Sequence, residues 1–591
     1  MGLGKKPLWR LLFPALRHIF HASPRESTLL LTLLALGGLV PVAVLGLTRA
    51  LVDQLAATLG GSSLTPALLW PLVGLALALG LDFLFTPWVA YLQGSVNEKL
   101  TARVHLLLME KAAGTPDLTP FEDPRFHDEL QVLRDQAPYQ PLNLLVFLGN
   151  AFREVLTVLG VLFLLFGLAP FFPLLLLLAT LPQAWLTFRL QKGVWEALLF
   201  GAPEARRMRY FAEVLLSPEA AKEVRLFGLL PFFRRRYLEA FHSFYQSLRH
   251  ARGRQALGTS LLVLLSALFT ALALLVGLRQ TLLGGSLGSL VLLLQSVGSL
   301  QQNLYALVQD GGMLYESLLY FERLEGFLAR PASLADTGRG RKVKGFEEIR
   351  FEGVGFCYPG GKRALAGVSF TLRRGECLAL VGENGAGKTT LVKLLRFYDP
   401  TEGRILVDGI DLREIDLKAW RALIAAVFQD FGRYALTLEE NVTLSHPDTK
   451  PDPKRVAEAF RLGGAWELLQ RLGPQALLSR AFGGVELSLG EWQRVALSRA
   501  FFRKAEILVL DEPTASLDPK EEAHLYRRFA EMAGGKTAIL ITHRLGSVRM
   551  ADRILVLQEG RLVEEGTHEE LLQKNGAYAE LWRLQAQLYE A

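Results

Sequence analysis

Two stretches near the end of the chain have residue types and spacing that suit phosphate binding. Residues 382–390 fit the pattern G-x-x-x-x-G-K-T. Glycines in such a loop let backbone N–H groups close around phosphates, Lys388 neutralises their charge, and the Thr389 hydroxyl reaches Mg²⁺. The loop residues expected to contact a nucleotide are Gly382, Glu383, Asn384, Gly385, Ala386, Gly387, Lys388, Thr389 and Thr390.

The second stretch is Leu487-Ser488-Leu489-Gly490-Glu491. A hydroxyl at Ser488 and a backbone N–H at Gly490, placed at the start of a helix, can bind the terminal phosphate of a nucleotide that another domain holds. The phosphate loop of the same chain cannot itself reach this turn. We therefore expect two halves of a site, which a nucleotide brings together from two chains.

A hydrophobic strand that ends in two carboxylates supplies the remaining chemistry. It comprises Ile507 to Leu510 and continues into Asp511 and Glu512. Asp511 is placed to hold Mg²⁺ through water, and Glu512 is placed to orient or deprotonate an attacking water. The pattern predicts hydrolysis of a nucleoside triphosphate.

The elements around these residues fit a soluble α/β domain. The stretch Cys377–Val381 is predicted to be a buried strand that runs directly into the phosphate loop, and a helix is predicted over 390–397. Strands are also expected over 351–358 and 367–372. A strand before the loop and a helix after it are the context that the motif requires.

Composition divides the chain into two parts. At 591 residues it is too long for one hydrophobic core, and its long apolar runs all precede about residue 310. The net charge of +7 comes from dispersed Lys and Arg that flank apolar runs, so we expect a membrane protein and no nucleic-acid partner. Cys357 and Cys377 are expected to be reduced and buried.

The amino-terminal half has six apolar runs, each predicted to cross a membrane because about 20 helical residues span the hydrocarbon core. The runs are Leu29–Gly46, Ala67–Leu92, Leu144–Leu168, Phe171–Leu190, Leu261–Leu278 and Leu287–Val308.

Basic residues predict the orientation of these spans. Five Lys or Arg residues precede the first run, and the connection over 54–66 has none. Positively charged segments stay on the cytoplasmic side. We therefore expect a multi-pass protein of the cell membrane with both termini in the cytoplasm and with long cytosolic loops at 94–142 and 191–255.

Each long loop has a short segment at its turning point, residues 120–127 and residues 221–228. In the first segment, Pro and acidic residues can start a helix, and its two aromatic residues, Phe121 and Phe126, are expected to be exposed. We expect the spanning helices to continue into the cytosol and these segments to dock on the soluble domain and transmit its movement. Three ionisable residues fall within apolar runs, Asp82, Arg153 and Glu154. An ion pair from Arg153 to Asp82 or Glu154 is one alternative, and a position of Arg153 and Glu154 outside the bilayer is the other.

The spacings together resemble those of ABC transporters, over essentially the whole chain. The resemblance implies a bundle of six transmembrane helices of the exporter type, followed by a cytosolic α/β P-loop ATPase domain. It predicts an amino-terminal segment over 1–28, a transmembrane domain over 29–328, a linker over 329–345 and a nucleotide-binding domain over 346–591.

The resemblance also implies roles for residues that the pattern alone does not assign. Tyr358 is expected to stack on adenine, and Gln429 to be the switch glutamine that links the nucleotide to the membrane domain. Asp518, in Ser516-Leu517-Asp518, resembles the D-loop, and His543 resembles the switch histidine that contacts the terminal phosphate. The implied catalytic set is Glu512, His543 and Gln429, and the implied metal set is Thr389, Gln429 and Asp511.

The turn at residues 487–491 is similar to the family signature L-S-G-G-Q but departs from it at Leu489 and Glu491. Glu491 loses an amide donor and adds a negative charge, which is expected to weaken closure on ATP. The stretches 427–434 and 482–486 resemble the branch that includes lantibiotic and peptide exporters.

These observations predict a half-transporter that uses ATP and Mg²⁺ and works as a dimer by alternating access. A homodimer is the default expectation because Lys388, Asp511, Glu512 and His543 are all present, and a heterodimer is the alternative. The expected cargo is a hydrophobic or amphipathic peptide, lipid or drug-like molecule. Two other functions stay open: a membrane-tethered ATPase that regulates a partner, and an importer of the same architecture.

Overall fold

The computed structural model describes residues 8–590, except 60–65, 175, 179, 183–184, 186–187, 190–201, 218–219, 283–284, 332–333, 335–339, 448–449, 513–535 and 544. It divides into two compact units. The first comprises Met1–Ala112 and Glu129–Arg330, and the second comprises Ala113–Asp128 and Pro331–Ala591. The domain boundaries at residues 28, 328 and 345 remain predictions.

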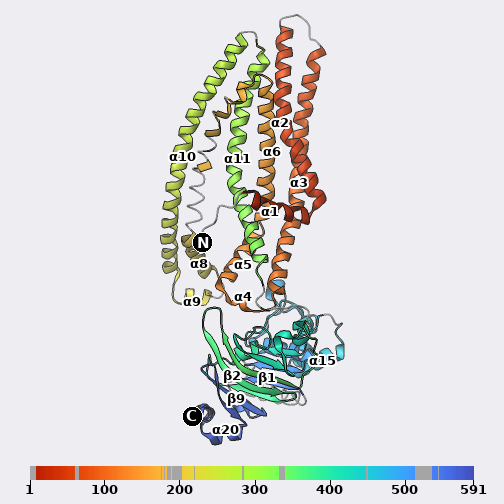
Figure 1. Cartoon of the computed structure of the whole chain (residues 1–591), viewed down its shortest axis with the longest axis vertical. Coiled ribbons are helices and arrows are strands. Elements are labelled where there is room, and N and C mark those ends of the chain that lie inside the picture. Colours follow the sequence, from red (N-terminus) through yellow and green to blue (C-terminus); the bar gives the residue numbers. More distant parts are fainter. Residues whose placement is uncertain are drawn as a thin grey trace. The chain divides into compact units, whose positions relative to one another are not determined.

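The first unit is helical, and its longest helices run side by side (Figure 1). Its helices are α1 (Leu8–Ala22), α2 (Pro24–Leu59), η1 (Pro66–Leu68), α3 (Leu69–Gly114), α5 (Pro124–Gln136), α6 (Gln140–Phe166), α8 (Ala202–Leu216), α9 (Ala221–Leu226), α10 (Leu230–Leu282) and α11 (Leu287–Leu328).

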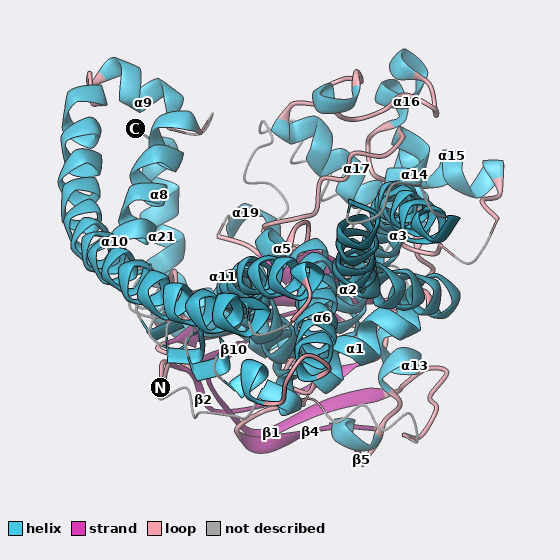
Figure 2. Cartoon of the chain, turned by 90° about the horizontal axis from the view of Figure 1, so that it is seen from above, coloured by secondary structure: helices cyan, strands magenta, loops and turns pink. Residues whose placement is uncertain are grey.

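Helices α2, α6 and α11 pack against one another, and α10 packs on α8 and α11 (Figure 2). Small residues permit the close approach of α2 and α6. The Thr157 hydroxyl donates a hydrogen bond to the Gly38 carbonyl at 2.9 Å. A Cβ atom added to Gly160 would lie 2.4 Å from a methyl group of Val42. Small residues and interhelical hydrogen bonds are the usual means by which membrane helices associate.

Three of the described helical segments are long and apolar enough to cross a membrane, judged by length and composition: Pro24–Thr58, Leu69–Gly114 and Gln140–Phe166. They overlap the first three predicted spans, which extend beyond them by at most two residues. The fourth predicted run lies partly outside the described residues, the fifth and sixth fall within α10 and α11, and these three remain predicted spans. The 46 residues of α3 extend about 69 Å, more than twice the hydrocarbon thickness of about 30 Å. The expected continuation of spanning helices beyond the bilayer therefore agrees with the helix lengths.

The charged residues at membrane depth do not pair as one alternative predicted. Among the described residues, Arg153 forms no ion pair with Asp82 or Glu154, and its side chain is exposed. A partly buried polar contact nearby is instead made by Asn150, which donates to the Asp310 carboxylate at 2.8 Å. The expectation of an Arg153 ion pair is thus wrong for this part of the chain.

The second unit contains two sheets. One is antiparallel in the order β2-β1-β4-β5, and the other has the order β10-β9-β3-β8-β7-β6. The strands are β1 (Glu348–Cys357), β2 (Arg363–Arg373), β3 (Cys377–Val381), β4 (Glu402–Val407), β5 (Ile410–Asp411), β6 (Ile424–Val427), β7 (Ile507–Asp511), β8 (Thr537–Ile541), β9 (Arg553–Gln558) and β10 (Arg561–Gly566).

Short helices accompany these sheets. They are α4 (Thr119–Glu122), α12 (Lys388–Lys393), η2 (Leu412–Glu414), α13 (Leu417–Ala422), α14 (Leu438–Thr443), α15 (Pro453–Leu462), α16 (Trp466–Leu472), η3 (Arg480–Phe482), α17 (Leu489–Phe502), α19 (Leu545–Val548), α20 (His568–Lys574) and α21 (Ala577–Glu590).

The main core of this unit joins the two sheets. Strands β3, β7 and β8 are buried at every residue, as expected for parallel strands covered on both faces. Side chains from β1, β2 and β4 pack with those of β3, β7 and β8, and Trp420 is fully buried among them. This rigid core holds the ends of the parallel strands, where the candidate site lies.

Candidate active site

The candidate catalytic residues follow four neighbouring parallel strands. The phosphate loop follows β3, and His543 follows β8. Asp511 is the last residue of β7, Glu512 comes directly after it, and Gln429 follows β6. These strands are adjacent in the order β3-β8-β7-β6, and each neighbouring pair is parallel. Their carboxyl ends therefore lie at one edge of the sheet, which is where α/β proteins bind ligands.

Glycines shape the phosphate loop. Gly382, Gly385 and Gly387 have φ angles of 151°, 82° and 99°, which other residues rarely adopt. A Cβ atom at Gly382 would lie 2.2 Å from the Leu557 carbonyl oxygen. Helix α12 begins at Lys388, two residues before the predicted start, so backbone N–H groups of its first turn point into the loop. The loop has the geometry of an anion-binding site.

Lys388 supplies the positive charge of this loop. Its ammonium donates hydrogen bonds of 2.8 Å to the carbonyls of Gly382 and Glu383, and the residue is 5% exposed. Burial lowers the pKa of Lys388, and the nearby carboxylates of Glu512 and Asp511 oppose that shift. The loop therefore holds a buried cation on its own carbonyls, from which it can turn toward phosphate oxygens.

Asp511 and Thr389 form an oxygen pair beside the loop. Their side chains are hydrogen-bonded, and Asp511 is 1% exposed. Burial raises the pKa of Asp511 to about 6, and the bond from Thr389 opposes the shift. Asp511 Oδ1 is buried with no hydrogen-bond partner. Oxygen donors with a spare carboxylate atom fit Mg²⁺, which keeps several waters and needs only one or two protein carboxylates.

Within the described ranges, no group of three or more His, Cys, Asp or Glu side chains could hold a metal ion.

Glu512 and His543 are in direct contact. Glu512 Oε1 lies 2.5 Å from His543 Nε2, and both side chains are partly exposed. Glu512 has a φ angle of 50°, an uncommon conformation for a residue with a side chain. Strain of this kind persists where the surrounding structure enforces it, and it is frequent at functional sites. Gln585 of α21 also donates a hydrogen bond to the His543 carbonyl.

The structure does not test the predicted roles of Tyr358, Gln429 and Asp518. The Tyr358 hydroxyl lies 2.9 Å from the Thr390 hydroxyl, and its ring packs edge-on against Phe356. Gln429 is exposed in a turn two residues beyond β6. Asp518 lies outside the described residues. Adenine stacking by Tyr358 and Mg²⁺ binding by Gln429 therefore remain predictions.

Ser488 is the N-cap of α17. Its hydroxyl accepts from the Glu491 backbone N–H, and the Glu491 carboxylate accepts from the Ser488 N–H at 2.8 Å. This reciprocal pair is a capping box. The Leu489 side chain is exposed, and the turn thus presents Ser488 and Gly490 at a helix N-terminus, as predicted.

Glu491, which departs from the family signature, has an ion-pair partner that the sequence analysis missed. The Arg471 guanidinium of α16 donates to Glu491 Oε1. Burial raises the pKa of Glu491, but the bonds from Ser488 and Arg471 outweigh this effect and leave the pKa below its usual value. The negative charge is therefore retained and paired, which reduces the repulsion that the sequence predicts. The S-x-x-E spacing is a sequence signal that could have identified the cap.

The first short loop segment docks within the second unit. The Tyr398 hydroxyl donates to Glu122 Oε1 of α4, and the Lys393 ammonium lies 3.7 Å from the same oxygen. The Leu118 N–H donates to the Phe397 carbonyl at 3.4 Å. The expected docking of residues 120–127 on the soluble domain is thus present, and Tyr398 and Lys393 are partners that the sequence analysis missed.

The aromatic residues of the two loop segments differ from expectation. Phe126 is 3% exposed, whereas Phe121 is 42% exposed, and their rings are 5.2 Å apart. The prediction of two exposed aromatics in the first segment is wrong for Phe126. In the second segment, Leu226 and Phe227 are both exposed.

Comparisons with known proteins agree with this geometry. The chain is 27% identical to the subtilin transport ATP-binding protein SpaT of Bacillus subtilis, over 92% of this chain and 89% of the relative. It is 35% identical to an ATP-dependent lipid A-core flippase of Chromohalobacter salexigens, over 62% of this chain and 63% of that protein. A solved bacterial Atm1-family ABC exporter with ATP bound superposes with a TM-score of 0.75 at 25% identity, over 95% of this chain and 98% of that one. Residues 365–515 match the family model described as ABC transporter.

The chain contains an ABC transporter family domain at residues 365–515. It is a half-transporter with a helical membrane region fused to one ATPase domain, and that domain binds ATP and couples its hydrolysis to transport. Its multi-pass helices place it in a membrane.

Proposed function

We propose that this ABC transporter is a Mg²⁺-dependent exporter of an amphipathic molecule and that it works as a homodimer. The observation that carries the proposal is the convergence of Lys388, Asp511, Glu512 and His543 at one sheet edge, in the unit on which α4 docks. A site for hydrolysis and a contact to a membrane-domain loop are thus held by one core.

Hydrolysis would use each residue in a distinct role. Lys388 would move from the carbonyls of Gly382 and Glu383 to the phosphate oxygens of ATP. Glu512 would accept a proton from the attacking water, and His543, in contact with it, would orient the carboxylate and donate to the terminal phosphate. Thr389, Asp511 and Gln429 would hold Mg²⁺, which supplies charge neutralisation on the phosphates when bound.

The dimer follows from the signature turn. Ser488 and Gly490 begin α17 with side-chain and backbone groups that suit a terminal phosphate. Because the chain has one phosphate loop and one such turn, two copies would complete two sites. The exposed Leu226 and Phe227 of the second loop segment would dock on the partner, while α4 docks on its own unit.

The relatives suggest the cargo and direction. One is named for subtilin transport, one for flipping lipid A-core, and the superposed structure is an exporter. A lantibiotic peptide and a lipid are both amphipathic, so we propose an amphipathic substrate moved outward. We also propose that both termini are cytoplasmic, because basic residues flank the first span on that side.

Glu512→Gln tests the hydrolytic core of this proposal. The variant is expected to bind ATP, to accumulate as a closed dimer and to lose about 100-fold or more of its ATP turnover, the range of general-base catalysis. Glu559→Gln is a matched control because Glu559 also has a positive φ, 48°, but lies in the exposed turn between β9 and β10. Normal turnover by Glu512→Gln would remove Glu512 from its catalytic role.

Transport is tested separately with the full chain in proteoliposomes. Transporters whose ATPase domains face the outside of the vesicle can use ATP that is added there. These copies should move an amphipathic peptide or lipid into the vesicle. ATP hydrolysis without movement of any ligand would favour the regulatory ATPase, and movement in the opposite direction would favour an importer. Two differently tagged copies that fail to co-purify would refute the homodimer.

A further inference from the structure

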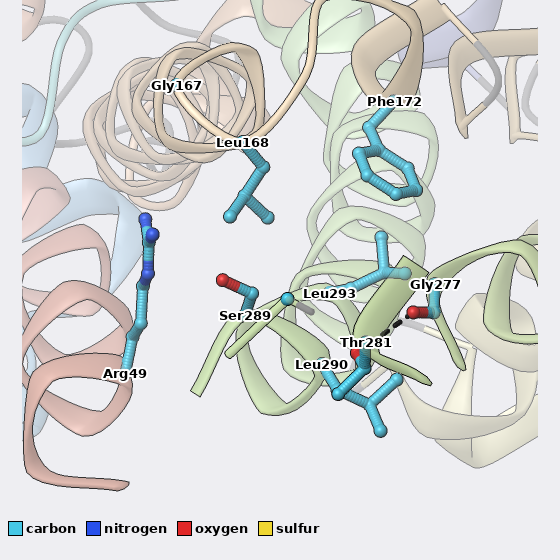
Figure 3. A pocket seen from close by; sticks show the side chains of 10 residues that line it. Arg49, Gly167, Leu168, Phe172, Gly277, Thr281, Ser289, Leu290 and Leu293 are labelled. Carbon is cyan, nitrogen blue, oxygen red and sulfur yellow. Dashed lines mark hydrogen bonds between the residues drawn. The ribbon is translucent and has the colours of Figure 1, made fainter. Parts of the chain in front are cut away.

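A small cavity lies toward the carboxyl-terminal end of α2. Its walls come from α2, α10, α11 and the chain that follows α6. Its volume is about 130 Å³, enough to hold several water molecules. The cavity is lined by Arg49, Gly167, Leu168, Phe172, Gly277, Thr281, Gly285, Ser289, Leu290 and Leu293. Figure 3 shows Arg49 reaching from α2 toward the opening that Leu168 and Ser289 also face.

Arg49 brings an incompletely satisfied charge to this cavity. Its Nε lies 3.8 Å from Asp53 Oδ2, too far for a hydrogen bond. Asp53 instead uses Oδ1 to accept the Gly288 backbone N–H at 2.7 Å, at the start of α11. Among the described residues, the five N–H donors of the Arg49 guanidinium have no hydrogen-bond acceptor. The side chain is 36% exposed and so remains accessible.

The position of Arg49 along α2 places it at a membrane interface. Arg25 and Arg49 are both in α2, and 24 helical residues at 1.5 Å each separate them by about 36 Å. A hydrocarbon core is about 30 Å thick. If Arg25 lies at one interface, Arg49 lies at the other, where headgroups and the polar ends of amphiphiles occur.

The walls of the cavity have two characters. Leu168, Phe172 and Leu290 give it an apolar side. The Ser289 hydroxyl is 2.7 Å from that of Ser286, and the Thr281 hydroxyl donates to the Gly277 carbonyl at 3.0 Å. The hydroxyls are therefore engaged with their own helices, and the guanidinium is the principal group left to recognise a ligand.

We propose that this cavity binds the phosphate or carboxylate of an anionic amphiphile, with Arg49 as the anion-recognising residue and the apolar wall receiving the adjoining hydrocarbon. A guanidinium pairs with two oxygens of such a group through parallel hydrogen bonds. The inference rests on the proposed export of an amphipathic molecule and gives that ligand a charge. The anion can belong to a lipid or exported amphiphile, or to a free phosphate.

Binding to the full chain in phosphatidylcholine nanodiscs tests the site. The probes are decyl phosphate, decanol and inorganic phosphate, each corrected for uptake by empty nanodiscs. We expect decyl phosphate to bind more tightly than decanol. Arg49→Gln should weaken decyl phosphate binding about 10- to 100-fold, the range for a hydrogen bond to a charged group. Displacement by millimolar inorganic phosphate would identify a free-anion site, and resistance to it would identify an amphiphile site.

Two further variants distinguish specific recognition of the anion by Arg49 from a general effect of positive charge. Arg279→Gln removes an exposed charge from the last turn of α10, outside the cavity lining, and should leave binding within about twofold. Arg49→Lys retains the charge and should recover part of the loss. Equal binding by Arg49→Gln and the unchanged protein, or equal losses in Arg49→Gln and Arg279→Gln, would overturn the anion site.

This readout needs no transport or ATP hydrolysis. If Glu512→Gln traps ATP and the chain exports an uncharged amphiphile while Arg49→Gln binds decyl phosphate normally, only the anion site fails. If Arg49→Gln loses binding but no ligand is moved, the anion site stands and the export proposal fails.

Discussion

The ion pair between Arg471 and Glu491 leads to a prediction about how tightly the signature turn closes on ATP. Glu491 stands where the family signature has Gln, and its carboxylate is held in the first turn of α17 by the capping box. The Arg471 side chain is 61% exposed and that of Glu491 is 16% exposed. Arg471→Gln removes the only cation that pairs with Glu491 among the described residues and leaves a negative charge at a proposed phosphate site.

The magnitude follows from Coulomb's law. An exposed ion pair itself contributes about 0.2–1 kcal/mol to folding, so the domain should remain folded without Arg471. Two unit charges about 8 Å apart repel by about 0.5 kcal/mol in bulk water and about 2 kcal/mol at an effective dielectric constant of about 20. We therefore expect Arg471→Gln to raise the ATP concentration for half-maximal ATPase activity by about 2- to 30-fold.

The assay is a double-mutant cycle measured by ATPase activity against ATP concentration. Glu491→Gln removes the charge and restores an amide, so its requirement for ATP should equal or fall below that of the unchanged protein. Adding Arg471→Gln to Glu491→Gln should then have little further effect, because no carboxylate remains to be neutralised. The Arg471→Gln defect should also shrink in high salt.

The reasoning is refuted if Arg471→Gln costs the same with and without Glu491→Gln. That result would show that Arg471 acts on the fold of α16 and not through the charge of Glu491. An unchanged ATP requirement in Arg471→Gln would show that the carboxylate does not face the phosphate.

Three further expectations concern coupling and pH. Tyr398→Phe removes the hydroxyl that donates to Glu122, a charge-assisted bond of about 1.5–3 kcal/mol, and should lower transport per ATP hydrolysed in proteoliposomes while ATP binding persists; an unchanged ratio would contradict a role in coupling. Phe227→Ser should likewise lower this ratio if α9 docks on the partner, and normal coupling would exclude that contact. Burial raises the pKa of Asp511 to about 6, so this carboxylate protonates as pH falls through 6 and binds Mg²⁺ less well; the Mg²⁺ concentration for half-maximal ATPase activity should be about fourfold higher at about pH 5.5 than at about pH 7.5, and equal requirements would remove Asp511 from the metal site.

Sequence reasoning locates the ATPase site well because its signals are local. The strand Cys377–Val381 has the predicted bounds, and the loop glycines have the backbone angles that the motif requires. The sheet order that brings Asp511, Glu512 and His543 to the loop is not local, and the structure supplies it. Parallel strand ends meet at one edge, so the prediction needed only the correct strand neighbours.

Contacts between distant residues could not be predicted in the same way. Tyr398 and Glu122 are 276 residues apart, and Arg471 and Glu491 are 20 residues apart on different helices. Each is an ordinary polar residue whose partner depends on how separate elements pack. Similarly, no sequence rule shows that Phe126 is buried and Phe121 is exposed, because their burial depends on how the loop segment packs in the folded chain.

The hydrogen bond from Gln585 to the His543 carbonyl has a practical consequence for handling the protein. Gln585 is six residues before Ala591, so the carboxyl-terminal helix touches the backbone of a candidate catalytic residue. An affinity tag or fluorescent protein fused directly after Ala591 would pull on α21 and, through this bond, on the imidazole beside Glu512. Turnover numbers measured with a carboxyl-terminal fusion would then report the fusion as well as the enzyme, and an amino-terminal tag is the safer choice.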